Sequence, residues 1–366
     1  MDFSASFQDP ELCRGLLARL EREMAAYGKP VRFMEVCGTH TVAIFQSGLR
    51  SLLPPGLTHL SGPGCPVCVT PPEVIDCYLA LAMEPDTVLC TYGDLMRVPG
   101  SRQGDNLNRR KALGARVEIV YSPLDALALA RAMPEKQVVF LGAGFETTAP
   151  GTAIAIREAQ RQSVPNFTVL SMLKRVEPAL RALMADPEFN VQGFLCPGHV
   201  ATILGETGFR FLPEQYSMPA VIAGFAPEEI LTAIDLLLAQ LEQKTPRLEN
   251  AYPEAVRPEG NPLARQWMEQ VFCPRDDLWR GLGAIPESGL GLRPDYADFD
   301  AERRFGLKPK PAETALPCRC GEVIQGKLAP EACPLFGTVC LPEEPVGPCM
   351  VSSEGACAAA YKYQRV

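Results

Sequence analysis

The sequence lacks long apolar runs and an excess of basic residues. It contains no stretch of about 18 apolar residues, so we expect no membrane-spanning helix. The 35 Lys and Arg are outnumbered by 43 Asp and Glu, which gives a net charge of −8 and argues against nucleic acid as a main partner. Residues 1–4 show neither the basic start nor the apolar core of a signal peptide. We therefore predict a cytoplasmic protein.

Cysteine, by contrast, is abundant, with 14 residues in a chain of 366. In a reducing compartment, closely spaced cysteines more often bind metal or perform redox chemistry than form structural disulfides. Six of them gather near the C-terminal end: Cys318, Cys320, Cys333, Cys340, Cys349 and Cys357.

Short apolar runs alternate with helix-like stretches through the first 250 residues. This alternation predicts α/β architecture with parallel sheets. Leucines at helical spacing predict a helix before Gly28, and a second helix is expected from about Pro227 to Lys244. The predicted strands start near Val31, Leu57, Thr87 and Arg116, and then near Lys136, Phe167, Val191 and Ala220.

We divide the chain into three parts. Residues 1–125, with the N-terminal helix, and residues 126–250 are predicted to be two similar α/β domains with a cleft between them. The segments ending in Cys37-Gly-Thr-His40 and Cys196-Pro-Gly-His199 resemble each other, which suggests a duplication. Residues 251–366 are rich in Pro and Gly with little periodicity, and we predict that they form a cysteine-rich iron–sulfur domain stabilised by its cysteines.

The C-terminal cysteines favour an iron–sulfur cluster. Four thiolates at wide spacing can hold a [4Fe-4S] cluster, and the predicted ligands are Cys320, Cys333, Cys340 and Cys357. A structural zinc site is the alternative, although the compact Cys-x2-Cys pairs typical of zinc are absent from this segment. Disulfides are a further alternative. Cys318 lies too close in sequence to Cys320 for both to be comfortable ligands, which leaves Cys318 and Cys349 as a candidate redox disulfide.

Two thiol motifs follow predicted strands in the N-terminal half. Cys37 and His40 could share a metal, or His40 and a helix N-terminus could lower the pKa of the thiol. The alternative is a buried cysteine with a capping histidine. Cys65-Pro-Val-Cys68 has the spacing of a redox dithiol or of half a metal site, and flanking Gly and Pro give it an unusual backbone.

Two further motifs lie at predicted strand ends. In Gly144-Phe-Glu-Thr-Thr148, Glu146 could face the cleft, or the motif could simply begin a helix. His199 could be catalytic or structural. The glycine motif before Glu146 is not a nucleotide fingerprint, because no third glycine follows at the right offset, and the chain has no Walker A lysine loop.

Together these motifs make the sequence resemble the HypD family of hydrogenase maturation proteins nearly from end to end. The matching segments are Met34–Thr41, Gly62–Val69, Gly93–Asp94, Arg97–Gly100, Tyr121–Ala126, Gly144–Thr148, Pro197–Val200, Trp279–Gly283, Cys320–Val323, Cys333–Gly337 and Val351–Cys357.

The resemblance implies two α/β domains and a third that carries a [4Fe-4S] cluster. It also implies a chaperone partner, HypC, and a cyanide donor, HypE, with which the Fe(CN)2CO part of the nickel–iron site is assembled. Cys37 would then bind the iron, with Cys65 and Cys68 as nearby redox thiols. A metal-assembly scaffold is thus expected rather than a turnover enzyme. The alternative is a stand-alone iron–sulfur thiol–disulfide oxidoreductase.

Overall fold

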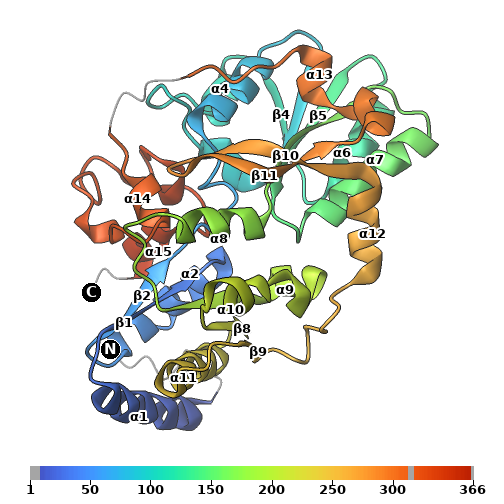
Figure 1. Cartoon of the computed structure of the whole chain (residues 1–366). Helices are drawn as coiled ribbons and strands as arrows, with labels where there is room; N and C mark the ends of the chain where they lie inside the picture. The colour runs from blue at the N-terminus through green and yellow to red at the C-terminus, as the bar shows by residue number, and fades with distance from the viewer. Residues whose placement is uncertain (1–8, 312–316, 364–366) are drawn as a thin grey trace.

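The computed structural model describes residues 9–311 and 317–363. Two parallel β-sheets form two lobes, seen in the lower and upper halves of Figure 1. Residues 1–4, on which the expectation of a missing signal peptide rests, lie outside the described residues. No helix in the described part of the chain is long and apolar enough to cross a membrane. The predicted α/β class with parallel sheets is confirmed.

The lower sheet has five parallel strands in the order β2-β1-β7-β8-β9. Helices α1 and α11 lie side by side against one face, where they share an apolar core with β1, β7 and β8 (Figure 1). The strands are β1 (Val31–Glu35), β2 (Leu57–Ser61), β7 (Gly193–Pro197), β8 (Ala220–Ala223) and β9 (Leu248–Asn250). The helices of this lobe are α1 (Pro10–Tyr27), α2 (Gly38–Gln46), α3 (Leu49–Leu52), α9 (Gly198–Leu204), α10 (Phe211–Tyr216) and α11 (Pro227–Gln243).

The ends of α1 follow from its sequence. The Asp9 carboxylate accepts a hydrogen bond from the Leu12 amide, and Pro10 begins the first turn, where no amide hydrogen is needed. Gly28 ends the helix at φ +68°, a conformation that glycine adopts without steric cost.

The upper sheet has four parallel strands in the order β4-β3-β5-β6. Every residue of β3 and β6 is buried, as expected for strands that are covered on both faces. The strands are β3 (Thr87–Thr91), β4 (Arg116–Ile119), β5 (Gln137–Gly144) and β6 (Phe167–Leu173). The helices are α4 (Pro72–Leu81), α5 (Leu107–Ala112), α6 (Pro123–Ala132), α7 (Ala149–Arg161) and α8 (Val176–Met184).

A hairpin that the sequence analysis did not predict extends this lobe. After α12 (Pro262–Val271), strands β10 (Phe272–Trp279) and β11 (Gly283–Leu292) pair antiparallel. The hairpin lies along β6, where the Ser171 hydroxyl donates to the Leu290 carbonyl at 2.6 Å. Alternating buried and exposed residues in β10 fit a strand that is exposed on one side.

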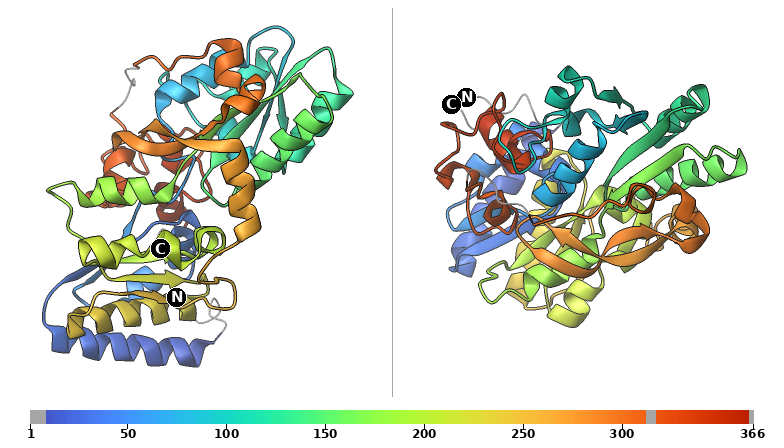
Figure 2. Two further views of the ribbon diagram at one scale, coloured as in Figure 1. Left: turned by 45° about the vertical axis from the view of Figure 1, so that its right-hand side comes forward. Right: turned by 90° about the horizontal axis from the view of Figure 1, so that it is seen from above.

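The cysteine-rich segment lies between the two lobes, at the left of Figure 1 and in both views of Figure 2. Its helices α14 (Cys320–Ile324) and α15 (Ala356–Tyr363) are short, whereas the preceding α13 (Ala301–Phe305) packs on β6 in the upper lobe. Helix α15 packs on α2 through Phe45, Ala359 and Ala360. The C-terminal segment is thus attached to the lobe that contains the start of the chain.

The predicted divisions at residues 125 and 250 do not coincide with the sheets. Strands β1 and β2 join β7, β8 and β9 in one sheet, while β3 to β6 form the other. The chain leaves the first sheet, builds the second and returns, because β1 pairs with β7 between Phe33 and Gly193. The two segments that resemble each other are therefore neighbouring strands of one sheet. The hairpin, at residues 272–292, belongs to the upper lobe rather than to a separate third domain.

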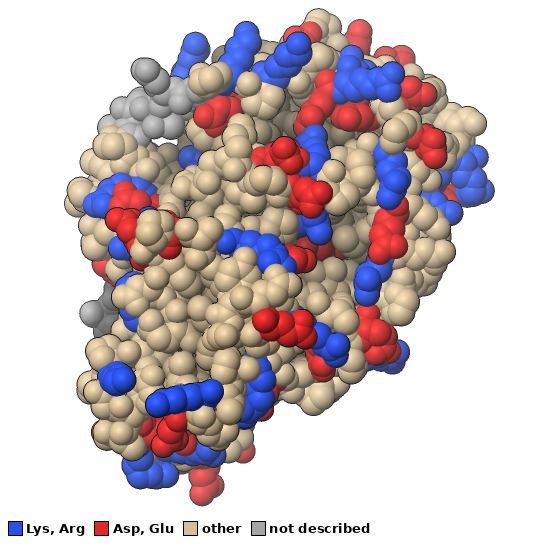
Figure 3. All heavy atoms as spheres, viewed as in Figure 1, with Lys and Arg blue, Asp and Glu red and all other residues tan. Residues whose placement is uncertain are grey.

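Charges of both signs are interspersed on the face shown in Figure 3, without a large patch of either sign.

Candidate functional site

A cavity of about 340 Å³ opens between the two lobes, and we call it the cleft. It is lined by the loops that follow β1, β2, β3, β5 and β7, together with Ser352–Glu354 from the C-terminal segment. In open α/β sheets the carboxyl ends of the strands are where binding sites form. Both sheets direct these ends into the same space, so segments far apart in sequence meet there.

Cys37 lies in the cleft at the end of β1, directly before α2. Its side chain is almost covered, since the residue is 8 % exposed. Burial raises the pKa of the Cys37 thiol to about 12, and nearby Glu35 and Glu354 add to the effect. The backbone amides of His40 and Thr39, at the start of the helix, oppose the shift but do not overcome it. The expected lowering of the pKa is therefore wrong for the metal-free thiol.

Two neighbours fix the backbone at Cys37. The buried Glu35 carboxylate accepts a hydrogen bond from the Cys37 amide at 2.8 Å and another from the Thr41 hydroxyl. Gly64, in the loop after β2, packs so closely that a Cβ there would lie 2.2 Å from the Cys37 nitrogen. The Gly64 carbonyl accepts the Gly38 amide at 3.0 Å. These contacts hold the loop that carries Cys65 against Cys37.

The two motif histidines are placed differently. His40 is fully buried, and its Nε2 donates to the Gly224 carbonyl at 2.8 Å, so it does not line the cleft. His199 is exposed and lines the cleft. Both rings contact Phe225, with centroid distances of 4.6 Å for His40 and 4.1 Å for His199. His40 therefore supports the wall of the cleft, and His199 is available to whatever enters it.

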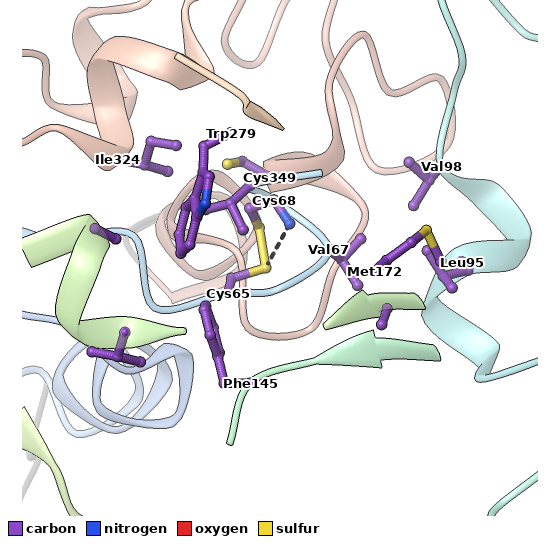
Figure 4. Packing of buried hydrophobic residues seen from close by; sticks show 14 of the residues in the cluster. Cys65, Val67, Cys68, Leu95, Val98, Phe145, Met172, Trp279, Ile324 and Cys349 are labelled. Carbon is purple, nitrogen blue, oxygen red and sulfur yellow. Dashed lines mark hydrogen bonds between the residues drawn. A yellow bond between two sulfur atoms is a disulfide. The ribbon is translucent and has the colours of Figure 1, made fainter. Parts of the chain in front are cut away.

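Cys65 and Cys68 form a disulfide, with their Cα atoms 5.2 Å apart. The Cys68 amide donates to the Cys65 sulfur at 3.1 Å (Figure 4). Both residues are buried in the main apolar core, close to Phe145, Trp279 and Cys349 in the same figure. The disulfide thus lies under the cleft wall that is formed by Gly64, Pro66 and Val67.

Glu146 faces away from the cleft. One carboxylate oxygen accepts the Val176 amide at 3.0 Å, at the start of α8. Its neighbours Phe145, Thr147 and Thr148 line the cleft, whereas Glu146 borders a different cavity. Burial raises the pKa of Glu146 to about 7. This geometry matches the structural interpretation of the motif, in which it begins and orients helices.

One wall of the cleft comes from residues that the sequence analysis did not select. Asp94, after β3, accepts hydrogen bonds from the Ser352 hydroxyl and from the amide and hydroxyl of Ser353, at 3.0 to 3.1 Å. Glu354 accepts the Thr39 hydroxyl at 3.1 Å beside Cys37. All of these residues belong to the motifs quoted for the resemblance, which was the only indication of their role.

All six C-terminal cysteines line a second, small pocket of about 20 Å³, which we call the cysteine pocket. Its other lining residues are apolar or glycine. Neighbouring thiols interact in the order Cys318, Cys320, Cys349 and Cys357. Cys320 lies between the predicted disulfide partners Cys318 and Cys349, and both of these are free thiols.

The donor chemistry of the cysteine pocket fits an iron–sulfur cluster. Thiols supply the ligands, apolar residues exclude water, and the Val346 amide donates to the Cys340 sulfur at 3.4 Å. No group of three or more His, Cys, Asp or Glu among the described residues is arranged to hold a metal ion. The thiol ligands and the apolar lining of the pocket suit a cluster held by cysteines.

The fold and the two sites define a class: an α/β protein with a thiol-bearing cleft between two parallel sheets and a separate pocket of six cysteines. Comparison with known sequences then gives the family. The family model described as "HypD: Hydrogenase formation hypA family" matches residues 11–364, and the chain belongs to this family.

Curated relatives match over their full length. The hydrogenase maturation factor HypD of Rhodobacter capsulatus is 44% identical, with 99% of this chain and 98% of that protein covered. The factors of the same name from Escherichia coli and Cupriavidus necator are also 44% identical over 100% of this chain, and 99% and 98% of their own lengths are covered. The resemblance stated from the motifs is confirmed.

Proposed function

We propose that this protein serves the maturation of [NiFe] hydrogenase in the cytoplasm, as a scaffold that holds iron at Cys37 while cyanide and carbonyl ligands are added. The observation that supports this is the position of Cys37, the one cysteine among the described residues lining the cleft. Iron that carries cyanide and carbon monoxide is a soft low-spin ion, which a thiolate can hold. The free thiol is protonated at neutral pH, so iron binding would have to displace its proton.

The partners would act at the cleft. A HypC-type chaperone would share the iron through a thiol of its own, and a HypE-type protein would bring cyanide. His199 and Thr39 offer polar contacts at this site, and the walls contributed by both lobes leave room for a small cargo. Family membership supports a maturation complex, and the cleft is a suitable place for it.

The cysteine pocket would hold a [4Fe-4S] cluster through Cys320, Cys333, Cys340 and Cys357. When bound, such a cluster supplies single electrons. The Cys65–Cys68 disulfide and the remaining pair, Cys318 and Cys349, would be the redox-active thiols of the protein. Cys349 and Cys68 belong to the same apolar core, which favours communication between the two sites.

The scaffold role is tested with Cys37→Ser. The hydroxyl is almost the same size but is a harder, poorly ionised ligand, so the fold should persist while iron with cyanide and carbonyl bands disappears. The measurement is infrared spectroscopy on protein co-purified with its HypC-type partner, together with hydrogenase activity in the host. Cys273→Ser is the matched control, because Cys273 is a free, half-buried thiol outside both sites. A Cys37→Ser protein that keeps the bands would refute the assignment.

The cluster is tested by anaerobic iron and sulfide analysis of single Cys→Ala variants. Loss of Cys320, Cys333, Cys340 or Cys357 should remove the cluster, and Cys273→Ala should not. Full content in Cys320→Ala with loss in Cys318→Ala would show that the other member of the pair is the ligand.

A second function, a stand-alone thiol–disulfide oxidoreductase, is favoured by one observation, the disulfide at Cys65 and Cys68. The two functions differ in iron content. A scaffold co-purified with HypC carries iron beyond the four atoms of the cluster, whereas an oxidoreductase does not.

A further inference from the structure

One wall of the cleft is attached to both lobes. On the upper side, the Asp94 carboxylate accepts three hydrogen bonds, from the Ser352 hydroxyl and from the amide and hydroxyl of Ser353, at 3.0 to 3.1 Å. On the lower side, the Glu354 carboxylate accepts the Thr39 hydroxyl at 3.1 Å. Three consecutive residues therefore bridge the two lobes across the cleft.

The same residues are joined to the cysteine pocket through the chain. They lie between Cys349 and Cys357, which both line that pocket, and we call residues 350–355 the strap. The two ends of the strap meet, because a Cβ on Gly355 would lie 2.1 Å from the Cys349 carbonyl oxygen. Helix α15 follows the strap directly and packs on α2 (Figure 1). A displacement of either cysteine is therefore passed directly to the strap.

The strap also packs on the backbone beside Cys37. A Cβ on Gly38 would lie 2.4 Å from the Glu354 Cβ and 2.9 Å from its Oε2, so this side chain rests on the start of α2. Cys37 is only 8 % exposed, and the strap is one of the segments that line the cleft around it. Detaching the strap removes one side of this enclosure.

We propose that the strap is a clasp between the lobes, and that the state of the cysteine pocket controls how firmly it closes over Cys37. The part of this inference that concerns the cluster rests on the proposed function. A group that binds only the folded form of a segment stabilises that segment against local opening. A cluster held by Cys357 and by three cysteines that precede the strap would therefore keep the clasp closed. Cargo at Cys37 is then retained in the cluster-loaded protein and released more readily once the cluster is lost.

The first test detaches the strap from one lobe at a time. Its readout is the initial rate at which N-ethylmaleimide alkylates Cys37, measured by peptide mapping of the full chain under anaerobic conditions without added reductant. Asp94→Asn weakens the upper attachment and Thr39→Val removes the lower one. Either should raise the rate roughly tenfold, which is the effect of about one hydrogen bond to a charged group. Both leave Glu354 in place, because its charge raises the pKa of the Cys37 thiol.

Matched variants separate the clasp from a general loss of structure. Thr39→Ser keeps the hydroxyl that Glu354 accepts and should alkylate at the wild-type rate. Asp298→Asn removes an exposed carboxylate of the upper lobe that does not line the cleft, and it should also leave the rate unchanged. If only one of Asp94→Asn and Thr39→Val folds, that variant decides, and an unchanged rate in it refutes the clasp.

The second test compares cluster-loaded with cluster-free wild type, after iron and sulfide analysis. In the loaded form, hydrogen exchange at the Ser353 amide and alkylation of Cys37 should both be roughly tenfold slower. The double variant Asp94→Asn, Thr39→Val should still bind the cluster, but the difference at Cys37 should disappear. Equal rates at Cys37 in the two forms of wild type overturn the control by the pocket.

A third comparison needs no cluster, so it decides the inference even if wild type binds none, an outcome that refutes the cluster of the proposed function. Cys349→Ala leaves a void in the pocket at the end of the strap, and Cys13→Ala leaves a similar void in the lower lobe. Both thiols are free and buried. Exchange at the Ser353 amide should accelerate roughly fivefold in Cys349→Ala alone. Unchanged exchange in that variant overturns the link between pocket and strap.

Discussion

Gly64→Ala should separate Cys37 from the loop after β2, which carries the Cys65–Cys68 disulfide. At Gly64 an added Cβ would lie 2.2 Å from the Cys37 nitrogen, 2.5 Å from its Cα and 2.5 Å from the Val36 carbonyl carbon. All three are backbone atoms, so no side chain can rotate away to make room. The loop after β2 has to move as a unit.

The cost has two parts. Inserting a methyl group into a packed site typically costs about 1–3 kcal/mol. Moving the loop also weakens the hydrogen bond from the Gly38 amide to the Gly64 carbonyl, which contributes about 0.5–1.5 kcal/mol. We therefore expect a loss of about 2–4 kcal/mol in the free energy of unfolding of the lower lobe.

Hydrogen exchange of the Gly38 amide and the urea midpoint provide the assay. Exchange at Gly38 should accelerate, and the midpoint should fall. Gly151→Ala is the control, because a Cβ there meets nothing within 4 Å and α7 gains up to about 1 kcal/mol in helix propensity. Unchanged protection at Gly38 and an unchanged midpoint in Gly64→Ala would refute the close-packing explanation for this glycine.

Three further predictions concern other parts of the molecule. Because burial raises the pKa of Glu146 to about 7 in the folded state, the contribution of this side chain to stability is present below about pH 4.5 and is lost as the pH rises through 7. In Glu146→Gln the urea midpoint should therefore change less with pH over this range, and at pH 8 it should be higher than the midpoint of the wild type. Asp94→Asn weakens the three hydrogen bonds that Ser352 and Ser353 donate to the carboxylate, so hydrogen exchange at the Ser353 amide should become faster. Unchanged exchange would show that Asp94 does not hold the Ser352–Glu354 wall of the cleft in place. Mild oxidation of cluster-free protein should yield a Cys318–Cys349 disulfide by peptide mapping, and a Cys320–Cys349 bond in its place would contradict the pairing.

The strands themselves could be predicted from the sequence, because each is a short apolar run between turn residues. The expected starts at Val31, Leu57, Thr87 and Arg116 are those of β1 to β4. Sheet membership could not be predicted, because the local pattern records that a strand is buried but not which strand it pairs with. The hairpin was not predicted, because Pro274 and the charged residues of β10 obscure the alternation of apolar and polar residues that is typical of a strand.

The site was predictable where its chemistry is local. The Cys65–Cys68 spacing indicated a dithiol, and the structure has a disulfide there. The proposed effect of His40 on Cys37 failed because residues three apart at a helix start can point in different directions, and His40 turns to the Gly224 carbonyl. The role of Glu354 depends on tertiary contact and has no local pattern of its own.

The return of the chain to its first sheet has a consequence for synthesis. Strands β3 to β6 follow one another in the chain and can pair as soon as they are synthesised. Strand β1 can pair with β7, Phe33 with Gly193, only after β7 has been synthesised. The cleft forms later still, because its wall includes Ser352, Ser353 and Glu354 near the C-terminal end. A growing chain thus already carries Cys37 but not the enclosure around it, and the cleft is complete only after residue 354 has been synthesised.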